Sequence, residues 1–305
     1  MSTPLAPETI AARERVRTAM PTEADLGFRR RVETIVEWVD TERPVRILDC
    51  GSGYGFVLRT LRDLTNATIV GLEYEAERVR EARETLGAHP RLSYVNGDAM
   101  NLPFADDSFD YVVCSEVLEH LPDDTRAAHE MFRVLKPGGA CVATVPCQDY
   151  PWTWDPLNWT LERFTGRHVG GRRPWSGIWY DHQRLYTRDE LTALMANAGF
   201  DIVETRGLTH ATFPFAHLLL YGIAKPLLRG GLVPPALRKQ VDRHEMTPTP
   251  PAGPTGAVFR TLERIDRPND APDLDDRERT FLGLAIRARK PDPGVTDAAP
   301  SASRP

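Results

Sequence analysis

The stretch VRILDCGSGYGF at Val45–Phe56 decides the fold. Its first half is an aliphatic run typical of a β-strand, and its second half is a glycine-rich turn. Gly51, Gly53 and Gly55 carry no side chains, so the backbone can turn tightly and a ligand can approach it closely. Gly55 also opens the next predicted helix. This stretch therefore predicts a strand, a ligand-binding turn and a helix in direct succession.

Strands and helices alternate along the chain beyond this turn. Short β-branched runs predict strands at Val45–Asp49, Thr68–Leu72, Leu92–Val95, Tyr111–Cys114, Ala140–Val145 and Phe200–Thr205, with Phe281–Arg289 as a closing strand. Helical patterns predict helices at Gly55–Leu64, Ala76–Leu86, Thr125–Leu135 and Thr187–Ala198. This order implies an α/β fold with a parallel sheet covered on both faces. Such sheets bind their ligands at the carboxyl ends of the strands.

The remaining segments divide the chain around that core. Residues 1–44 are expected to form an N-terminal helical region, with residues 1–20 loosely ordered and an amphipathic helix at 26–39. The core is expected at 45–206, with an irregular aromatic insertion at 147–186. An apolar and proline-rich insertion follows at 207–279, then the closing strand at 280–290 and a disordered tail at 291–305.

Composition excludes several classes of protein. The chain has 305 residues, 41% of them hydrophobic, and a formal net charge of −5. This acidic balance argues against nucleic-acid binding, which needs a concentrated basic surface. No apolar run reaches the roughly 20 residues that span a bilayer, and the N-terminus lacks an apolar signal core, so a cytoplasmic protein is expected. The four cysteines have no metal-binding spacing, which predicts buried thiols and no metal site.

The spacing of the glycines restricts the class of nucleotide that the turn can bind. A nicotinamide-binding fingerprint requires glycine at position 56, which is Phe56, and the phosphate-binding loop with its lysine is absent. The pattern that remains is D-x-G-x-G-x-G, beginning at Asp49. Glu73 ends the second predicted strand, where an acid can accept two hydrogen bonds from a ribose diol. The alternative is a solvated carboxylate at the end of a strand.

The third predicted strand is followed by YVNGDAMNLPF, which contains Asp98 and Ala99. The Asp98 carboxylate could accept a hydrogen bond from an adenine amino group, and the Ala99 backbone amide could donate to a ring nitrogen. The alternative is an aspartate that only stabilises a turn. We favour the nucleoside-binding interpretation for both residues.

The ordered series LDCGSGYG, GLEYE, GDAMNLPFADDSFDYVVCSEVLEHL and RVLKPGGACVATVP resembles class I S-adenosylmethionine-dependent methyltransferases. The likeness is strongest to the large group that includes the ubiquinone and menaquinone C-methyltransferases, and it extends from about Arg46 to Thr205. It implies a doubly wound, Rossmann-like sheet of seven strands, mostly parallel, whose last strand is antiparallel.

The resemblance also implies how S-adenosylmethionine, the cofactor, is bound. Its methionine and ribose portions are expected against Gly51, Gly53 and the region of Asp49, with Gly55 completing the loop. Glu73 is expected on the ribose hydroxyls, Asp98 and Ala99 at the adenine, and Ser115 beside the sulfonium.

Methyl transfer from a sulfonium is an in-line displacement with an activated donor, so the protein mainly aligns the acceptor and excludes water. A hydroxyl or acidic-carbon acceptor also needs a base.

Two pairs of residues are candidates for this base. Glu116 and His120 are four residues apart and would share one face of a helix, although a histidine at this place in the family can simply shape the pocket. Asp181 and His182 form a second pair, or else a surface pair. His182 is the favoured base, with His120 as the alternative.

Two sequence comparisons argue against particular classes of methyl acceptor. Enzymes that methylate exocyclic amines of bases often carry an N/D-P-P-Y/F motif after the fourth strand, and here that position reads CSEV. Cys147 lies where cytosine-C5 methyltransferases have a nucleophile, but the partner motif is missing. Both classes are therefore disfavoured.

The substrate side is expected in two unusual segments. The 147–186 insertion contains five of the six tryptophans and four arginines, which suit either a pocket lid that binds an anionic group or a packed loop. Phe213–Leu228 is apolar and could contact a membrane peripherally or form a packed helix.

The favoured reaction is O- or C-methylation of a small lipophilic or lipid-linked acceptor. A soluble sugar or natural-product acceptor and a non-catalytic cofactor-binding protein remain alternatives, and the oligomeric state is left open.

Overall fold

The structure, a computed structural model, describes residues 6–23, 25–39, 42–173, 175–212, 215 and 253–294. Its centre is a seven-stranded sheet with the order β3-β2-β1-β4-β5-β7-β6. The strands are β1 (Arg46–Cys50), β2 (Thr68–Glu73), β3 (Leu92–Asn96), β4 (Phe109–Ser115), β5 (Leu135–Pro146), β6 (Asp201–Leu208) and β7 (Gly283–Arg289). β7 runs antiparallel to both of its neighbours, β5 and β6, and the other pairs are parallel. The predicted doubly wound sheet with an antiparallel last strand is confirmed.

The order of the strands reverses between β1 and β4. From β1 the chain moves outward through β2 to β3, and it then returns to β4 on the other side of β1. The neighbouring strands β1 and β4 therefore carry connections that leave in opposite directions. In open α/β sheets this switch point is where a crevice for a ligand forms, at the carboxyl ends of the strands.

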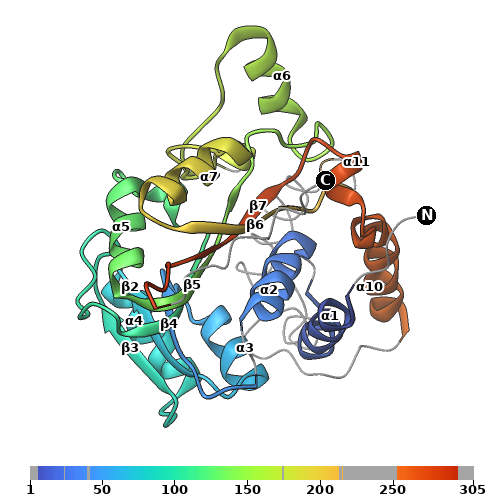
Figure 1. Ribbon diagram of the computed structural model, residues 1–305. Helices are drawn as coiled ribbons and strands as arrows, with labels where there is room; N and C mark the ends of the chain where they lie inside the picture. Colours follow the sequence, from blue (N-terminus) through green and yellow to red (C-terminus); the bar gives the residue numbers. More distant parts are fainter. Residues whose placement is uncertain are drawn as a thin grey trace, which may run out of the picture.

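Helices cover both faces of the sheet (Figure 1). One apolar core joins the sheet to α5 (Asp124–Val134) and α7 (Arg188–Asn197), and the other joins it to α1 (Pro7–Ala19), α2 (Leu26–Trp38) and α3 (Phe56–Leu64). Adjacent strand residues go to opposite cores, as Ile47 and Leu48 do, because side chains alternate across a strand. The helix α4 (Ala76–Leu86) connects β2 to β3.

The N-terminal residues are helical, and the expectation of a loosely ordered segment at 1–20 is wrong for Pro7–Ala19. Ala12 and Val16 are buried in the core that α1 shares with α2. Arg17 also forms an ion pair with Glu33 of α2, with 2.9 Å between Nε and Oε1. The sequence pattern did not predict α1 because the helix has few apolar residues. Two small apolar side chains and charge pairing hold it against the rest of the protein.

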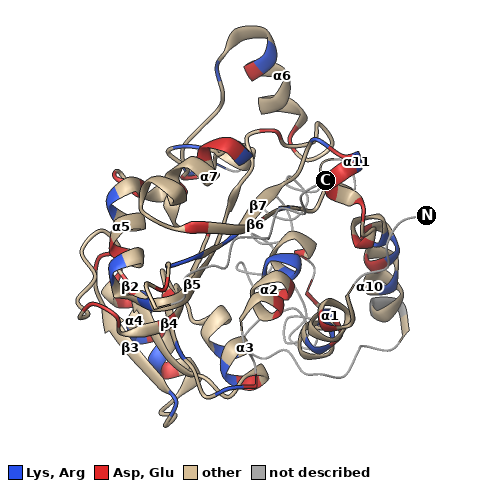
Figure 2. Cartoon of the chain, in the orientation of Figure 1, with Lys and Arg blue, Asp and Glu red and all other residues tan. Residues whose placement is uncertain are grey.

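The C-terminal helices are α10 (Gly253–Asp266), η4 (Arg267–Asp270) and α11 (Leu274–Arg277). Ion pairs attach α10 and η4 to α1 and α2, whereas Leu274 of α11 is buried in the core that contains α5 and α7. Acidic and basic side chains intermingle on α1, α2 and α10 (Figure 2). At their centre Arg30 and Asp266 form a buried two-pronged ion pair, with both N–O distances 2.8 Å. Charge pairing as well as apolar packing therefore attaches α10 to the core.

The aromatic insertion contains a helix that the sequence analysis did not expect, α6 (Pro156–Thr165), and the short helix η2 (Gly177–Trp179). In Figure 1, α6 projects at the top of the molecule, away from the sheet. Its start and end follow known capping rules: the Asp155 side chain accepts from the Asn158 amide, Pro156 occupies the first turn, and Gly166 closes the helix in the left-handed region. The expectation of an irregular segment throughout 147–186 is therefore wrong for this part.

Two further expectations concern the cysteines and the membrane. All four cysteines are free and buried, as expected. No helix in the part of the chain that the structure describes is long and apolar enough to cross a membrane. Except for Phe215, the apolar segment 213–228 lies outside the described residues, so its expected contact with a membrane stays a prediction.

Candidate functional site

The glycine loop joins β1 to α3 at the switch point. Gly51, Gly53 and Gly55 all have positive φ, at 82°, 52° and 84°, which residues with a side chain rarely adopt. A Cβ on Gly51 would lie 2.3 Å from Cγ2 of Val117, so the loop packs directly on the segment that follows β4. A Cβ on Gly53 would meet no atom of the described chain within 4 Å. A Cβ on Gly55 would lie 2.8 Å from Cδ1 of Leu86, so two glycines of the loop are tightly packed and Gly53 faces open space.

Glu73 holds this loop from the end of β2. Its Oε2 accepts a hydrogen bond from the Gly53 amide and its Oε1 accepts one from the Glu75 amide, both at 2.9 Å. A carboxylate has about four lone-pair sites, so these two bonds leave capacity for the two hydroxyls of a ribose. Glu73 is where the sequence predicted it, and it has a second, structural role that the sequence did not reveal.

Asp49 lies at the end of β1 and is only 2% exposed. Its Oδ2 has no hydrogen-bond partner among the described residues. Burial, together with the charge of Glu73, raises the pKa of Asp49 to about 7. A buried carboxylate oxygen without a partner favours a cationic ligand, and S-adenosylmethionine has a cationic ammonium and sulfonium. The residues present therefore fit this cofactor.

The other predicted cofactor residues lie after the neighbouring strands. The Asp98 Oδ1 accepts from the Met100 amide at 2.8 Å, so one carboxylate oxygen stabilises a turn and the other is left for a ligand. Ala99 is buried beside it. Ser115 ends β4, and its hydroxyl lies 2.9 Å from that of Thr144. Since β1 to β4 are adjacent, parallel strands, all the predicted cofactor residues come to one edge of the sheet.

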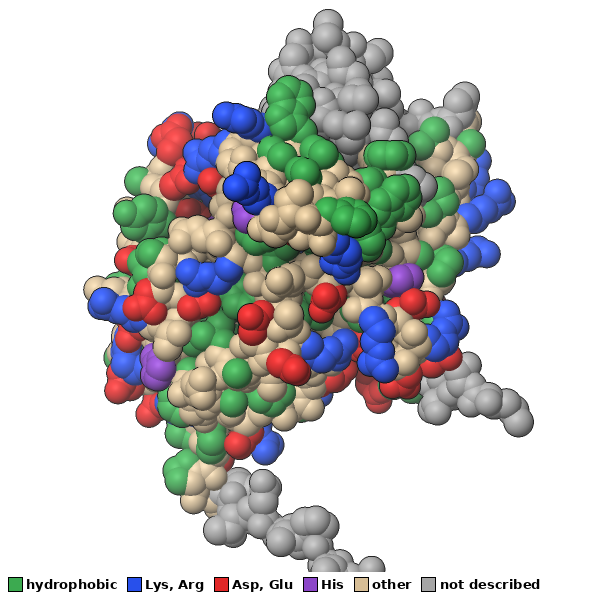
Figure 3. All heavy atoms as spheres, turned by 90° about the horizontal axis from the view of Figure 1, so that it is seen from above, with side chains coloured by type: hydrophobic (Ala, Val, Ile, Leu, Met, Phe, Trp, Pro, Cys, Tyr) green, Lys and Arg blue, Asp and Glu red, His purple; other side chains and the backbone are tan. Residues whose placement is uncertain are grey.

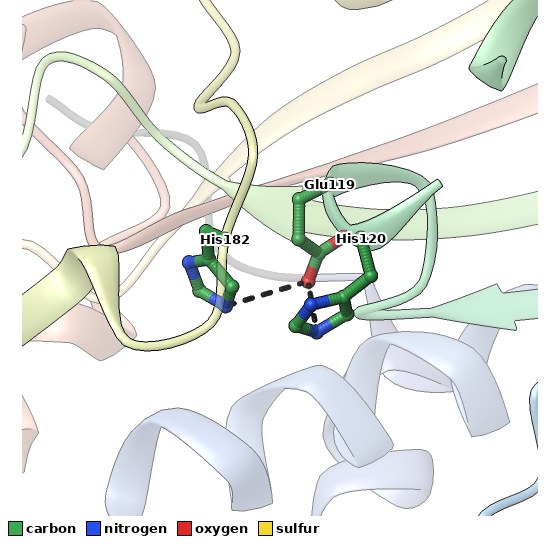
Figure 4. Close-up of side chains that lie close together, drawn as sticks. All are labelled: Glu119, His120 and His182. Atoms are coloured by element: carbon green, nitrogen blue, oxygen red, sulfur yellow. Dashed lines mark ion pairs between the residues drawn. The ribbon is translucent and has the colours of Figure 1, made fainter. Parts of the chain in front are cut away.

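Next to this edge, two histidines from distant parts of the chain meet a buried acid. Glu119 and His120 belong to the short helix η1 (Leu118–His120) after β4, and His182 belongs to the loop after η2. The two imidazole rings are 4.9 Å apart between centroids, edge to face. The Glu119 Oε1 lies 3.8 Å from Nε2 of His120 and 3.9 Å from Nε2 of His182, and Figure 4 shows it between the rings. We call these three residues the Glu–His–His cluster.

Backbone hydrogen bonds fix the His182 loop against η1. The Gln183 amide donates to the Glu119 carbonyl at 2.9 Å, and the Gln183 side chain donates to the His120 carbonyl at 2.7 Å. The His120 Nδ1 lies 2.9 Å from the Asp181 carbonyl. Because a carbonyl only accepts, Nδ1 of His120 carries a proton in this contact, and Nε2 is the ring nitrogen near Glu119. The two sequence-predicted histidines thus form one site and not two alternatives.

The acids predicted beside these histidines have other partners. Glu116 does not share a helix face with His120, because η1 begins only at Leu118 and Glu116 has a positive φ of 56°. Its Oε2 instead lies 3.6 Å from Nη1 of Arg31. The Asp181 carboxylate pairs with Arg172 at 2.8 Å, and this hydrogen bond lowers the pKa of Asp181. The carboxylate between the histidines is Glu119.

Glu119 was not predicted from the sequence. It is 0% exposed, and its carboxylate oxygens have no hydrogen-bond partner in the described chain other than its own backbone amide. Burial, followed by the charge of Glu116, raises the pKa of Glu119. Burial also lowers the pKa of His182, although the charge of Glu116 opposes this shift. A signal was present in the sequence, since an acid within the apolar run VLEHL is expected to be buried.

The aromatic insertion divides into packed and exposed parts. Trp154, Trp159 and Trp179 pack around a small core of Tyr150, Ile178 and Leu185. In contrast, Trp152, Leu157, Phe164, Trp175 and Tyr180 are exposed. Seen from above, hydrophobic side chains lie open on the face toward which α6 projects (Figure 3). Most of the tryptophans therefore stabilise the insertion, and the remainder give it an apolar surface.

The chain is similar in sequence to known methyltransferases. A family described as methyltransferase domain matches residues 48–143. Methyltransferase GfsG of Streptomyces halstedii is 37% identical over 189 residues, which cover 61% of this chain and 63% of that protein. The 2-phytyl-1,4-naphtoquinone methyltransferase of Thermosynechococcus vestitus is 30% identical over 179 residues, which cover 55% of this chain and 78% of that protein. The match thus spans less than two thirds of the length of GfsG and more than two thirds of the second relative.

A solved structure shares the fold at low sequence identity. The cyclase SpnF aligns with a TM-score of 0.54 and 21% identity, over 86% of this chain and 80% of that one. This likeness supports the architecture of the sheet and carries no information about the reaction. Family membership depends on the domain match and on the two methyltransferases. The chain belongs to the class I S-adenosylmethionine-dependent methyltransferases.

Proposed function

We propose that the protein transfers a methyl group from S-adenosylmethionine to an oxygen or carbon atom of a small lipophilic acceptor. The observation that carries this proposal is the position of the Glu–His–His cluster directly beside the glycine loop. Gly51 packs on Val117, which is two residues before Glu119. A cofactor on the loop and an acceptor on the cluster would therefore be neighbours, as an in-line displacement requires.

The residues of the sheet edge would hold the cofactor. In this proposal Glu73 accepts from the ribose hydroxyls while it holds Gly53, and Asp49 faces the cationic methionine portion. Asp98 and the Ala99 amide contact the adenine, and Ser115 lies beside the sulfonium. When bound, S-adenosylmethionine supplies a methyl group that is already activated as a sulfonium. The protein's task is then to align the acceptor and to exclude water.

Two features support a lipophilic acceptor. The relative from Thermosynechococcus vestitus is named for a phytyl naphthoquinone, which is a lipophilic substrate. The insertion that carries His182 also exposes large apolar side chains, including Trp175 and Phe164. Exposed apolar side chains on the insertion that also carries His182 suit a substrate that is itself apolar. His182 and His120, the bases expected from the sequence, are the polar groups that we place against the acceptor's reacting atom.

The experiment is to incubate the full-length protein with S-adenosylmethionine labelled in its methyl group and with fractionated cell extract. We expect label in an organic-soluble product. Label in an aqueous product would contradict the lipophilic acceptor and favour a sugar or another soluble intermediate. If the protein binds the cofactor but labels no fraction, it is a binding protein and the proposed activity is wrong. A Gly53→Val variant, which places a side chain in the open space of the loop, controls for label that enters without the cofactor site.

A further inference from the structure

We propose that Glu119, His120 and His182 bind a divalent transition-metal ion of the zinc class. One carboxylate oxygen and two imidazole nitrogens converge here, and these ligand atoms all lie within 4.8 Å of one another. Cysteine spacing predicts no metal site, and this cluster uses none of the cysteines. The three ligands come from two segments separated by about 60 residues, so no short sequence motif predicts this metal site.

The distances within the cluster are longer than hydrogen bonds and longer than those between ligands of one metal ion. At 3.8 and 3.9 Å, the Glu119 oxygen is too far from either imidazole nitrogen for a hydrogen bond. Zinc ligands at about 2.0–2.2 Å from the ion lie roughly 3.4 Å from one another in a tetrahedral site. Each contact would therefore shorten by about 0.5 Å on metal binding, which small side-chain rotations can supply.

The Asp181 carbonyl fixes the orientation of the His120 ring. Because Nδ1 donates to this carbonyl, Nε2 is the nitrogen that is left to bind a metal, and it lies 3.8 Å from the Glu119 Oε1. Histidines that bind metals commonly donate their other ring nitrogen to a carbonyl or carboxylate in this way, because the bond fixes the tautomer and the orientation of the ring. The positive φ of Asp181, 63°, is the backbone conformation that brings this carbonyl to His120.

Glu119 gives a second, independent indication of a ligand. A completely buried carboxylate whose oxygens lack an outside partner is costly unless an ion compensates it. Burial raises the pKa of Glu119 and the charge of Arg31 opposes this shift, but the ion pair of Arg31 is with Glu116 and not with Glu119. Nε2 of His120 and Nε2 of His182 lie 3.8 and 3.9 Å from the Glu119 Oε1, and Figure 4 shows the three side chains close together. A divalent cation would satisfy all three ligands together.

The donor set selects the type of metal. Two imidazoles and one carboxylate suit zinc and other first-row transition metals, whereas magnesium and calcium prefer oxygen ligands alone. Three protein ligands leave at least one position open, as in catalytic zinc sites. If the proposed function holds, an acceptor hydroxyl would occupy that position. Its proton would leave to solvent, and the O–CH₃ bond would form as the S–CH₃ bond breaks.

The test is metal binding by the full chain without a polyhistidine tag. Protein freed of metal with a chelator is titrated with Zn²⁺, Co²⁺ or Mg²⁺ alone by calorimetry, and Co²⁺ is followed by its visible absorption. We expect one Zn²⁺ or Co²⁺ per chain and much weaker binding of Mg²⁺. In Glu119→Gln and His182→Ala the affinity should fall by about 100-fold or more, since even partners outside the ligand shell contribute 10–100-fold. His129→Ala, an exposed histidine on α5, is the matched control and should bind as the wild type does.

Circular dichroism shows whether each variant is folded, and Glu119→Gln keeps the size of the buried side chain. The proposal is overturned if the wild type takes up neither Zn²⁺ nor Co²⁺, or if both cluster variants bind them as tightly as the wild type. Mg²⁺ binding as tight as that of Zn²⁺ would contradict the two imidazole ligands. Binding of S-adenosylmethionine is measured in parallel, because its absence with an intact metal site would overturn the proposed function and leave the metal site standing.

Discussion

Asp49 and Glu73 are two buried carboxylates on adjacent strands, and they are satisfied very differently. Glu73 accepts two backbone amides, whereas Oδ2 of Asp49 has no partner within the described part of the chain. Burying an acid without full compensation destabilises its charged form. Such a residue lowers the stability of the folded state unless a ligand compensates it, which is why we assign Asp49 to cofactor binding.

The raised pKa of Asp49 gives a pH dependence with a definite sign. The pKa of Asp49 is about 7 in the folded protein, against the ordinary value of 3.8 that applies in the unfolded chain, so the folded protein holds the proton more tightly. Stability of the cofactor-free protein should therefore decline as pH rises from about 4 to 7, by an amount on the order of a few kcal/mol. Denaturant titration across this range checks the trend, and Asp49→Asn should flatten it.

Cofactor affinity should show the opposite trend. Above pH 7 Asp49 is charged and attracts a cationic ligand, so S-adenosylmethionine should bind more weakly as pH falls below 7. Asp49→Asn should weaken binding and remove most of this pH dependence, even though it stabilises the empty protein. Affinity that is equal in wild type and variant at every pH would show that Asp49 does not face the ligand.

At the scale of elements, the sequence predicted the strands and the helices between them, but it missed α1, α6 and α10 and the contacts that build the site. The pairs Glu116/His120 and Asp181/His182 were singled out, and each contains a histidine of the cluster. Their meeting depends on hydrogen bonds from the amide and the side chain of Gln183 to backbone carbonyls of η1, and the sequence pattern does not reveal these acceptors. The same holds for Asp181, whose backbone carbonyl accepts from His120 while its carboxylate pairs with Arg172.

The attachment of α10 to α2 can be tested through its buried ion pair. Asp266 accepts from Arg30 through two bonds and from Arg29 at 3.1 Å, and all three side chains are nearly inaccessible to solvent. Asp266→Ala leaves two buried arginines without this partner, which should lower the free energy of unfolding by about 3–5 kcal/mol. Chemical denaturation measures the loss.

The matched control for that change is an acid on the surface. Glu84→Ala removes an exposed partner of Arg80 on α4, where solvent screens the charges, so stability should hardly change. If Asp266→Ala were as stable as Glu84→Ala, apolar contacts alone would hold α10 in place.

At the scale of the whole molecule, the order of the motifs predicted the architecture because each motif ends a strand. LDCGSGYG, GLEYE and the run through CSEVLEHL follow β1, β2 and β4, and parallel strands bring their carboxyl ends to one edge. The position of the cofactor residues could be predicted for that reason. The acceptor side could not, because it is built from an insertion whose docking depends on tertiary contacts.

The last prediction concerns this edge as a single ligand site. A ligand that binds only the folded state stabilises it by RT ln(1 + [L]/Kd), about 2.7 kcal/mol at a hundredfold excess over Kd. For a chain of this size, S-adenosylmethionine or its demethylated product should then raise the melting temperature by roughly 5 °C. NAD should produce no shift, because Phe56 occupies the place of the third glycine of a nicotinamide fingerprint. Thermal unfolding with each ligand decides between them. A shift with NAD and none with S-adenosylmethionine would remove the basis for methyl transfer, since the loop, Glu73 and Asp49 would then serve another nucleotide.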